Sequence, residues 1–523
     1  MKKKRVLAAL LMGCMLALCG CQSTDRGVVV KEQETVEATE ETQEETSVEI
    51  EEGEEDPGIL QITFYPEVED DYDPGSGQWL LHTEYQRIEA KGGSEKAVQA
   101  IGQWSQKRVE EIKNARAQGV IAALGEEQTT DYYRYSIYES LRAARIDRRV
   151  VSLVEQNSEY TGGAHGNYGS SGVNFDAETG ELLTLSDLLT DEEGFRERAE
   201  EELIRKLTAA YSDELFPDYE DTILKMWESG FNWYLDGAGI TFIFQPYEIG
   251  PYALGEVCVT LPYQEMEAYL EPSCLPERCL TPSGAGIFAI PMEEEIPLFL
   301  AAADSQPHML ELGIVGEEGY GPIRLKLGDS SVETEPFERL GNAFLVCRTD
   351  GRSFLIFDAD YASDDFVTFV YELTDGILKE CDRQNGLSIQ GGTINTEALR
   401  LQMHLDVLGT YSSFMDYTID ENGNLKASAD WFEISGDSNA WQELLTVREL
   451  PVWMEGEETS LPAGSHICIT ATDNQGIVRF TVIDTEESGE IHFVRGDGAE
   501  DTWTIFIDGV PDQEYFEMLP YAG

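Results

Sequence analysis

The residue types that most often carry enzyme chemistry are scattered along this sequence. Six histidines stand at isolated positions, and no His-x-x-x-His pair places two imidazoles on one helical face for a metal ion. The sequence also lacks a Gly-x-Ser-x-Gly nucleophile motif, a phosphate-cradling Gly-x-x-x-x-Gly-Lys and a dinucleotide fingerprint. With 100 acidic residues, almost any two carboxylates could be paired on paper as a glycosidase site. We therefore predict no catalytic residue, no metal site and no cofactor.

One acidic stretch and the cysteines were considered as metal or redox sites. Asp420 to Asn424 partly matches a calcium loop, but it lacks the closing glutamate and predicts a hairpin turn instead. Cys274 and Cys279 lie in a proline-marked loop and could pair in an oxidising compartment. The strand-like surroundings of three others predict buried free thiols: Cys258, Cys347 and Cys468.

Two segments gather residues that could bind a ligand. The first, Tyr160 to Gly166, contains paired glycines that predict a turn with positive φ, and a histidine that could contact a ligand or hydrogen-bond within the turn. The second, Phe244 to Gly255, predicts a rigid aromatic and proline-containing loop packed on a sheet. The candidate ligand-binding residues are Tyr160, Gly162, Gly163, His165, Tyr247, Pro251 and Tyr252.

The elements around these segments predict an α+β fold, with helices packed on an antiparallel sheet, over residues 59–275. Alternating apolar residues from Ile59 predict a strand, and Ser94 is a suitable N-cap for a helix whose apolar face carries Ala97, Ile101, Trp104 and Ile112. A second helix is predicted over about 193–211, followed by strands at 239–245 and 256–261.

The chain changes character after Pro282, where short strands and turn signals become frequent. This pattern predicts a mostly-β domain over 282–440. The last segment, 441–523, carries its own turns and strands and predicts a small β barrel.

The N-terminal residues have the layout of a secretory signal peptide. A cationic start, Met1 to Arg5, precedes an apolar run from Val6 to Leu18, which is too short to cross a bilayer. The following Cys19-Gly20-Cys21-Gln22 resembles a bacterial lipobox, so we predict a lipoprotein signal peptide over 1–20 and lipidation of Cys21. The Glu- and Thr-rich residues that follow predict an acidic disordered tether over 21–58.

The net charge restricts the class of partner. The formal charge is −64, and loss of four basic residues with the signal peptide would make it −68. Binding to nucleic acid or to anionic lipid headgroups requires a basic surface and is disfavoured. A cationic partner would be attracted, although acidity alone also serves solubility.

Two motifs resemble a domain pair of unknown function that occurs outside bacterial cells. Tyr160 to Gly166 resembles its first signature, and Phe244 to Gly255 its second, with Phe175-Asp176, Thr179-Gly180 and Leu185 to Leu189 between them. The family includes the lysozyme-sensing anti-sigma factor RsiV and the peptidoglycan deacetylase PdaC. The resemblance covers about residues 59–272 and implies an RsiV/PdaC-like fold at 59–275 rather than an activity.

These features together predict a lipid-anchored protein on the outer face of the bacterial cell membrane that binds or senses an envelope ligand. In the lysozyme-sensing relative the domain binds its partner through surface loops, so the resemblance implies a cationic protein such as lysozyme, or a cell-wall component, as the partner. A cell-envelope enzyme with an unrecognised site, or a structural module of an envelope assembly, remains open as an alternative.

Overall fold

The computed structural model describes residues 58–125, 134–277, 284–292, 294–301, 304–316, 320–361, 365–434, 443–496 and 504–521. These residues belong to one compact unit. The predicted signal peptide, Cys21, nearly all of the predicted tether and Cys279 lie outside the described residues. No described helix is both long and apolar enough to span a membrane.

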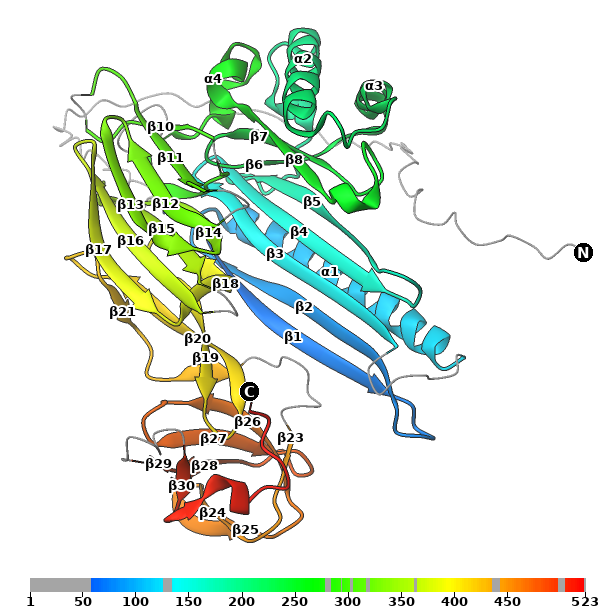
Figure 1. Ribbon diagram of the computed structural model, residues 1–523, viewed down its shortest axis with the longest axis vertical. Coiled ribbons are helices and arrows are strands. Elements are labelled where there is room, and N and C mark those ends of the chain that lie inside the picture. Colours follow the sequence, from blue (N-terminus) through cyan, green and yellow to red (C-terminus); the bar gives the residue numbers. More distant parts are fainter. Residues whose placement is uncertain are drawn as a thin grey trace, which may run out of the picture. The chain divides into compact units, whose positions relative to one another are not determined.

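The N-terminal strands form the first part of a long sheet that carries helix α1 on one face (Figure 1). Its elements are β1 (Gln61–Tyr72), β2 (Trp79–Lys91), α1 (Glu95–Ala123), β3 (Tyr135–Asp147), β4 (Val150–Tyr160) and β5 (Asn167–Asp176). The predicted antiparallel sheet has one parallel pair, that of β2 with β3. Parallel neighbours need a crossover, and α1 supplies it.

Helix α1 begins and packs as its sequence predicts. The Ser94 hydroxyl accepts a hydrogen bond from the backbone N–H of Lys96 at 3.2 Å, which satisfies one of the free donors of the first turn. Ala97, Ile101 and Ile112 are buried against the sheet. The indole of Trp104 meets the ring of Phe175 edge to face, with ring centroids 5.9 Å apart.

A second layer of strands and helices follows β5. It consists of α2 (Glu192–Tyr211), α3 (Tyr219–Ser229), β6 (Asn232–Leu235), β7 (Gly239–Phe244), β8 (Val257–Pro262) and the short α4 (Tyr263–Met266). The predicted second helix is confirmed within one residue, and its residues at i+4 spacing, Phe195, Ala199, Leu203 and Leu207, are fully buried. These helices lie against the small antiparallel sheet β6-β7-β8 (Figure 1).

The long sheet continues past the predicted boundary near Pro282. Strand β9 (Gly286–Ala289) pairs with β3 on one side and with β14 (Arg339–Cys347) on the other. Beyond them run β15 (Ser353–Asp360), β16 (Phe366–Thr374) and β17 (Ile377–Asn385). A separate sheet contains β10 (Ile296–Leu298), β11 (His308–Ile314), β12 (Gly321–Leu327) and β13 (Ser330–Phe337).

The remaining described strands do not form the predicted terminal barrel. They are β18 (Leu387–Ile394), β19 (Leu399–Asp406), β20 (Thr410–Ile419), β21 (Leu425–Ala427), β22 (Phe432–Ile434), β23 (Glu443–Leu445), β24 (Leu450–Met454), β25 (Glu457–Leu461), β26 (His466–Thr472), β27 (Ile477–Val482), β28 (Ser488–His492), β29 (Val494–Arg495), β30 (Ile505–Ile507) and β31 (Val510–Pro511). In the described part, β22 joins β20 to β26, so one open sheet runs from β18 to β25 and does not close. The barrel prediction was wrong because strand spacing does not reveal which edge a strand joins.

Hydrogen bonds also join β1 to residues at the end of β18, which are distant in sequence. The backbone N–H of Ile62 donates to Asn395 Oδ1 at 2.9 Å, and Asn395 Nδ2 donates back to the carbonyl of Ile62 at 2.9 Å. The hydroxyl of Thr393 accepts from the N–H of Phe64 at 3.0 Å. Side chains at the end of β18 thus satisfy the outer edge of β1.

Candidate functional site

The two loops that contain the candidate ligand-binding residues lie side by side. The first connects β4 to β5, and the second connects β7 to β8. The hydroxyl of Tyr252 in the second loop donates a hydrogen bond to the carbonyl of Gly166 in the first, at 3.0 Å. The imidazole of His165 stacks on the ring of Tyr252, with centroids 4.1 Å apart and planes inclined by 24°.

Four rings form one cluster on this surface, which we call the ring cluster: His165, Tyr168, Tyr247 and Tyr252. Tyr168 meets Tyr252 edge to face and Tyr247 lies tilted against it, each at a centroid distance of 5.5 Å. Tyr247 is 56% exposed and Tyr168 39% exposed. Grouped, exposed aromatic rings with polar tips are the residue type that dominates protein interfaces.

Tyr252 is the central member of the ring cluster. Desolvation, and then the neighbouring Tyr168 and Tyr247, raise the pKa of its hydroxyl. The hydroxyl therefore stays protonated and continues to donate to the Gly166 carbonyl. Its contacts hold the two loops together, so the ring cluster has a fixed arrangement before any ligand arrives.

Tyr247 is held outward by an unusual turn. The backbone N–H of Glu248 donates to the carbonyl of Gln245 at 3.0 Å, which closes a four-residue turn with Pro246 and Tyr247 in the middle. Tyr247 has φ = 73°, the left-handed region that glycine or asparagine normally occupies at this position of a type II turn. The Glu248 carboxylate also accepts from the N–H of Gln245 at 2.7 Å, and burial raises the pKa of this carboxyl.

Glycines let strand β5 approach the second loop and β6 closely. A Cβ on Gly169 would lie 2.0 Å from Oε1 of Gln245, whose Nε2 donates to the carbonyl of Ser170 at 2.6 Å. A Cβ on Gly172 would lie 1.8 Å from the backbone carbonyl oxygen of Trp233. Gly169 and Gly172 lie on opposite faces of β5, and each leaves room where a side chain would meet a neighbouring segment.

The sequence-predicted candidates separate into two groups. His165, Tyr247 and Tyr252 meet in the ring cluster. Gly162 and Gly163, with φ of 87° and 105°, shape the exposed turn between β4 and β5, and the hydroxyl of Tyr160 donates to the carbonyl of Gly163 at 3.2 Å. Pro251 is exposed and precedes the single helical turn Tyr252–Leu254. That these residues bind a ligand stays a prediction.

Tyr168, which completes the ring cluster, is not among the residues predicted from the sequence. The signal for it was the spacing of Gly166, Gly169 and Gly172, which marks a strand that packs closely against other backbone. The face of the strand on which a tyrosine between such glycines lies depends on the strand register. Only the pairing of β5 with β4 shows that Tyr168 shares a face with Ser158.

A hollow of about 380 Å³ lies beside the ring cluster. Its walls come from β3, β4, β5 and the end of the β7–β8 loop, and it is lined by Tyr138, Ser140, Gln156, Asn157, Ser158, Tyr168, Gly169, Ser170 and Glu256. Tyr168 belongs to both features. The hollow and the ring cluster together form the candidate functional site.

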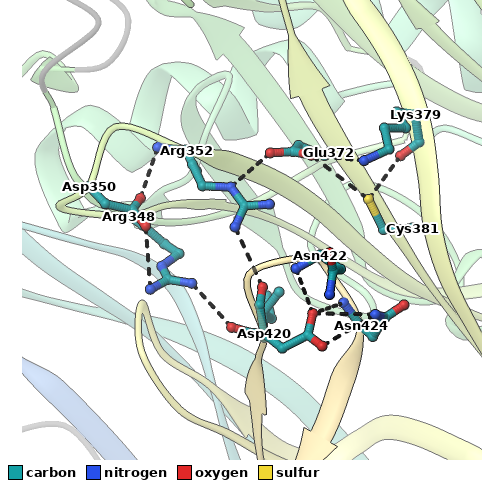
Figure 2. Close-up of polar contacts among 10 residues, drawn as sticks. Arg348, Asp350, Arg352, Glu372, Lys379, Cys381, Asp420, Asn422 and Asn424 are labelled. Atoms are coloured by element: carbon teal, nitrogen blue, oxygen red, sulfur yellow. Dashed lines mark hydrogen bonds and ion pairs between the residues drawn. The ribbon is translucent and has the colours of Figure 1, made fainter.

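A second polar cluster, around Asp420, links two hairpins by hydrogen bonds (Figure 2). Asp420 Oδ1 accepts from the backbone N–H groups of Asn422 and Asn424 at 2.8 and 2.9 Å, so the predicted hairpin turn is confirmed. Arg352 bonds Glu372 Oε1 at 2.8 Å and reaches the carbonyl of Asp420 at 3.5 Å. The guanidinium thereby ties the hairpin β20-β21 to the long sheet.

The thiols and carboxylates of the described residues do not gather into a metal-binding group. No group of three or more His, Cys, Asp or Glu side chains among them could hold a metal ion. Cys258 is exposed, contrary to its predicted burial, because it alternates along β8 with the buried Val257 and Val259 and so faces away from their core. Burial raises the pKa of the Cys381 thiol, which keeps it in the less nucleophilic form.

Comparisons with known proteins find one family domain in the chain, and this domain contains the β7–β8 loop of the site. Residues 186–264 match the family model DUF3298, a protein family of unknown function, so the second layer with its β7–β8 loop is a DUF3298 domain. No curated protein matches the sequence.

Two solved structures resemble the chain. A member of the DUF3298 family from Bacteroides fragilis is 20% identical, with a TM-score of 0.33, over 42% of this chain and 96% of its own. A DUF3298 family protein from Pseudomonas aeruginosa is 18% identical, with a TM-score of 0.32, over 42% of this chain and 98% of its own.

Proposed function

We propose, starting from the DUF3298 domain at residues 186–264, that this chain is an extracytoplasmic lipoprotein that binds a cationic protein through the ring cluster. The observation that carries the proposal is the meeting of two distant loops in one exposed group of four rings. The resemblance to the lysozyme-sensing family makes lysozyme the first partner to test.

The chemistry of the ring cluster favours binding over catalysis. Its one imidazole bonds a backbone carbonyl, that of Gly166 at 2.9 Å, rather than a side chain that could serve as a nucleophile or orient it as a base. Its tyrosines have few rotatable bonds and are already in contact, so little conformational freedom is lost when a partner covers them.

Charge and rings have different parts in this proposal. A formal charge of −64 attracts a basic protein from a distance, but this attraction weakens as the Debye length falls from about 10 Å at 0.1 M salt to about 3 Å at 1 M. Contacts with the aromatic rings do not depend on salt in this way. Specific binding should therefore persist when salt is raised.

The test is calorimetry of residues 56–523, the compact unit, with lysozyme at about 0.15 M and about 0.5 M salt. We expect binding at both concentrations. Tyr252→Ala should weaken it by about 2 kcal/mol, roughly thirtyfold, because an anchor ring is lost together with the bond that joins the loops. His165→Ala should weaken it less, because that ring lies at the side of the cluster.

The matched control is Tyr320→Ala, which removes a tyrosine that is 57% exposed outside the site. It should leave affinity unchanged. Binding that disappears at the higher salt, or that is unchanged by Tyr252→Ala, would show that the interaction depends only on the acidic net charge. Absence of binding at both salt concentrations would remove lysozyme as the partner.

Membrane attachment has its own test. If lipid on Cys21 anchors the protein, Cys21→Ala should move it from the membrane fraction to the soluble extracellular fraction, since one modified residue carries the whole attachment. Equal amounts of wild type and variant in the membrane fraction would refute the lipoprotein proposal.

A further inference from the structure

The hollow beside the ring cluster is built from regular cross-strand rows. In one row, Tyr138 on β3 pairs with Ser158 on β4, which pairs with Tyr168 on β5. In the next row, Ser140 and Ser170 flank Gln156 in the same way. Because residues two apart in a strand share a face, both rows project from one face of the sheet, opposite the face that α1 covers (Figure 1).

The two tyrosines make the side walls of a slot. Their Cα atoms are separated by two strand spacings, about 10 Å, with Ser158 between them. Tyr138 is supported from behind by the ring of His82, with centroids 5.3 Å apart, and Tyr168 by Tyr252. The slot floor is formed by Ser140, Ser158 and Ser170 together with the amide side chain of Gln156.

A carboxylate with spare acceptor capacity lies at the end of this hollow. Oε2 of Glu256 is buried and has no hydrogen-bond partner among the described residues. Its Oε1 receives only a long contact from the Cys258 thiol, at 3.9 Å. A buried carboxylate oxygen without a donor carries a desolvation cost that an incoming cation would offset.

A close approach brings the Tyr168 hydroxyl to Gly255, the residue before this glutamate. Gly255, the residue before Glu256, has φ = 78°, and a Cβ there would lie 3.3 Å from the Tyr168 hydroxyl. The absence of a side chain at Gly255 thus lets the ring and the acid line the same space. Two aromatic rings and an acid that line one hollow match a basic side chain, whose stem is apolar and whose head is charged.

We infer that the hollow is a docking pocket for a lysine or arginine side chain of the protein partner, with its stem between Tyr138 and Tyr168 and its cationic head on Glu256. This inference deepens the proposed function and rests on it for the source of the side chain. The ring cluster then forms the surrounding contact area, and the hollow holds the central anchoring side chain of the partner.

The experiment uses small probes, so that it does not depend on any one partner. Residues 56–523 are titrated, by NMR shifts, with Nα-acetyl-lysine methylamide and with Nα-acetyl-norleucine methylamide, which has a stem without the charge. We expect saturable binding of the lysine probe alone. Glu256→Gln, which keeps shape and removes charge, should weaken it at least about tenfold, the loss typical of a charge-assisted hydrogen bond.

The matched control is Glu159→Gln. Glu159 is exposed and adjacent to Ser158 in β4, so its side chain points to the opposite face while it contributes equally to the net charge. It should leave probe binding unchanged. If Glu256→Gln unfolds the protein, Ser140→Trp, at an exposed position on the slot floor, should fill the hollow and abolish binding instead.

Equal binding of the lysine and norleucine probes, or equal effects of the two Glu→Gln variants, would overturn the pocket. So would saturable binding of N-acetylglucosamine in competition with lysine, because it would assign the hollow to a saccharide. Lysozyme that binds while the lysine probe does not would remove the pocket and leave the proposed function. A probe that binds while lysozyme does not would keep the pocket and remove lysozyme as its partner.

Discussion

Tyr247 shows how one residue can trade stability for an exposed position. Its left-handed backbone costs about 1 to 2 kcal/mol relative to glycine. The neighbouring bonds between Gln245 and Glu248 hold the turn in spite of that cost. A strained, exposed aromatic residue beside three other rings is consistent with selection for contact rather than for folding.

Replacing Tyr247 by glycine should have opposite effects on stability and on partner binding. Tyr247→Gly should raise the free energy of unfolding by about 1 kcal/mol, because glycine relieves the strain at φ = 73°, and should weaken partner binding because the ring is lost. Denaturant unfolding and calorimetry on the same sample measure both. Tyr247→Ala keeps the strain and should not gain stability. A Tyr247→Gly variant no more stable than Tyr247→Ala would contradict the strain argument.

A partly buried acid between α1 and the sheet, Glu139, makes stability depend on pH. Burial, and then the charge of Glu155, raise the pKa of Glu139 from 4.5 to about 7, although Arg108 lowers it. Because the folded value lies above the unfolded one, the native state holds an extra proton between these values. The stability that this proton provides is present below pH 4.5 and is lost as the pH rises through about 7.

Glu139→Gln should therefore gain stability relative to wild type as the pH rises. We expect little difference in the free energy of unfolding near about pH 4.5 and the largest advantage of the variant near about pH 8. Glu181→Gln, at an exposed turn position, is the control and should differ from wild type by the same amount at both pH values. A pH-independent difference for Glu139→Gln would show that the carboxyl titrates normally.

At the scale of elements, β5 is the strand that unites the two halves of the site. It pairs with β4 along its whole length, and it faces β6 and the β7–β8 loop closely through its glycines. The two close approaches differ in kind. The atom opposite Gly169 is the end of the flexible Gln245 side chain, whereas the atom opposite Gly172 is backbone carbonyl.

This difference predicts an order of stability for two alanine variants. Gly172→Ala should lower the free energy of unfolding by about 3 kcal/mol, because strands β5 and β6 must separate to admit the methyl group. Gly169→Ala should cost less, since Gln245 can move, but it should weaken partner binding by shifting Tyr168. Thermal or denaturant unfolding checks the order. Equal stability losses would mean that the β7–β8 loop is as rigid as the strand.

At the scale of the whole molecule, one core and one sheet run through the predicted domain boundaries. The core that surrounds Ile62 and Phe175 also contains Ile287, Phe354 and Leu401. The C-terminal core around Phe480 likewise contains Val407 and Leu408, which precede the predicted boundary at residue 441. Contacts that cross a boundary in this way couple the unfolding of its two sides.

We therefore expect residues 56–275 to be much less stable alone than within residues 56–523. The fragment would expose the edge of β3 that β9 covers and lose much of the shared core. Circular dichroism during denaturant unfolding, at equal protein concentration, gives both midpoints. A fragment with a cooperative transition at the midpoint of the longer chain would establish an independent domain that ends near Pro282.

The sequence by itself determined the features that depend on near neighbours in the chain. The cap at Ser94, the i+4 stripe of α2 and the turn at Asp420 follow from local hydrogen bonding and periodicity, and all are confirmed. The two signature segments, from Tyr160 and from Phe244, were also recognisable, because their glycines, proline and aromatic residues stand close together in sequence.

Only the tertiary structure decided how these pieces meet. The parallel pairing of β2 with β3, the passage of the sheet through β9 and the open C-terminal sheet depend on which strand edges pair, and local patterns do not encode edge choice. For the same reason the sequence did not show that Tyr168 completes the ring cluster, nor that Glu256 lines a hollow with residues about 100 positions earlier. Strand register and loop packing create the site from residues that the chain keeps apart.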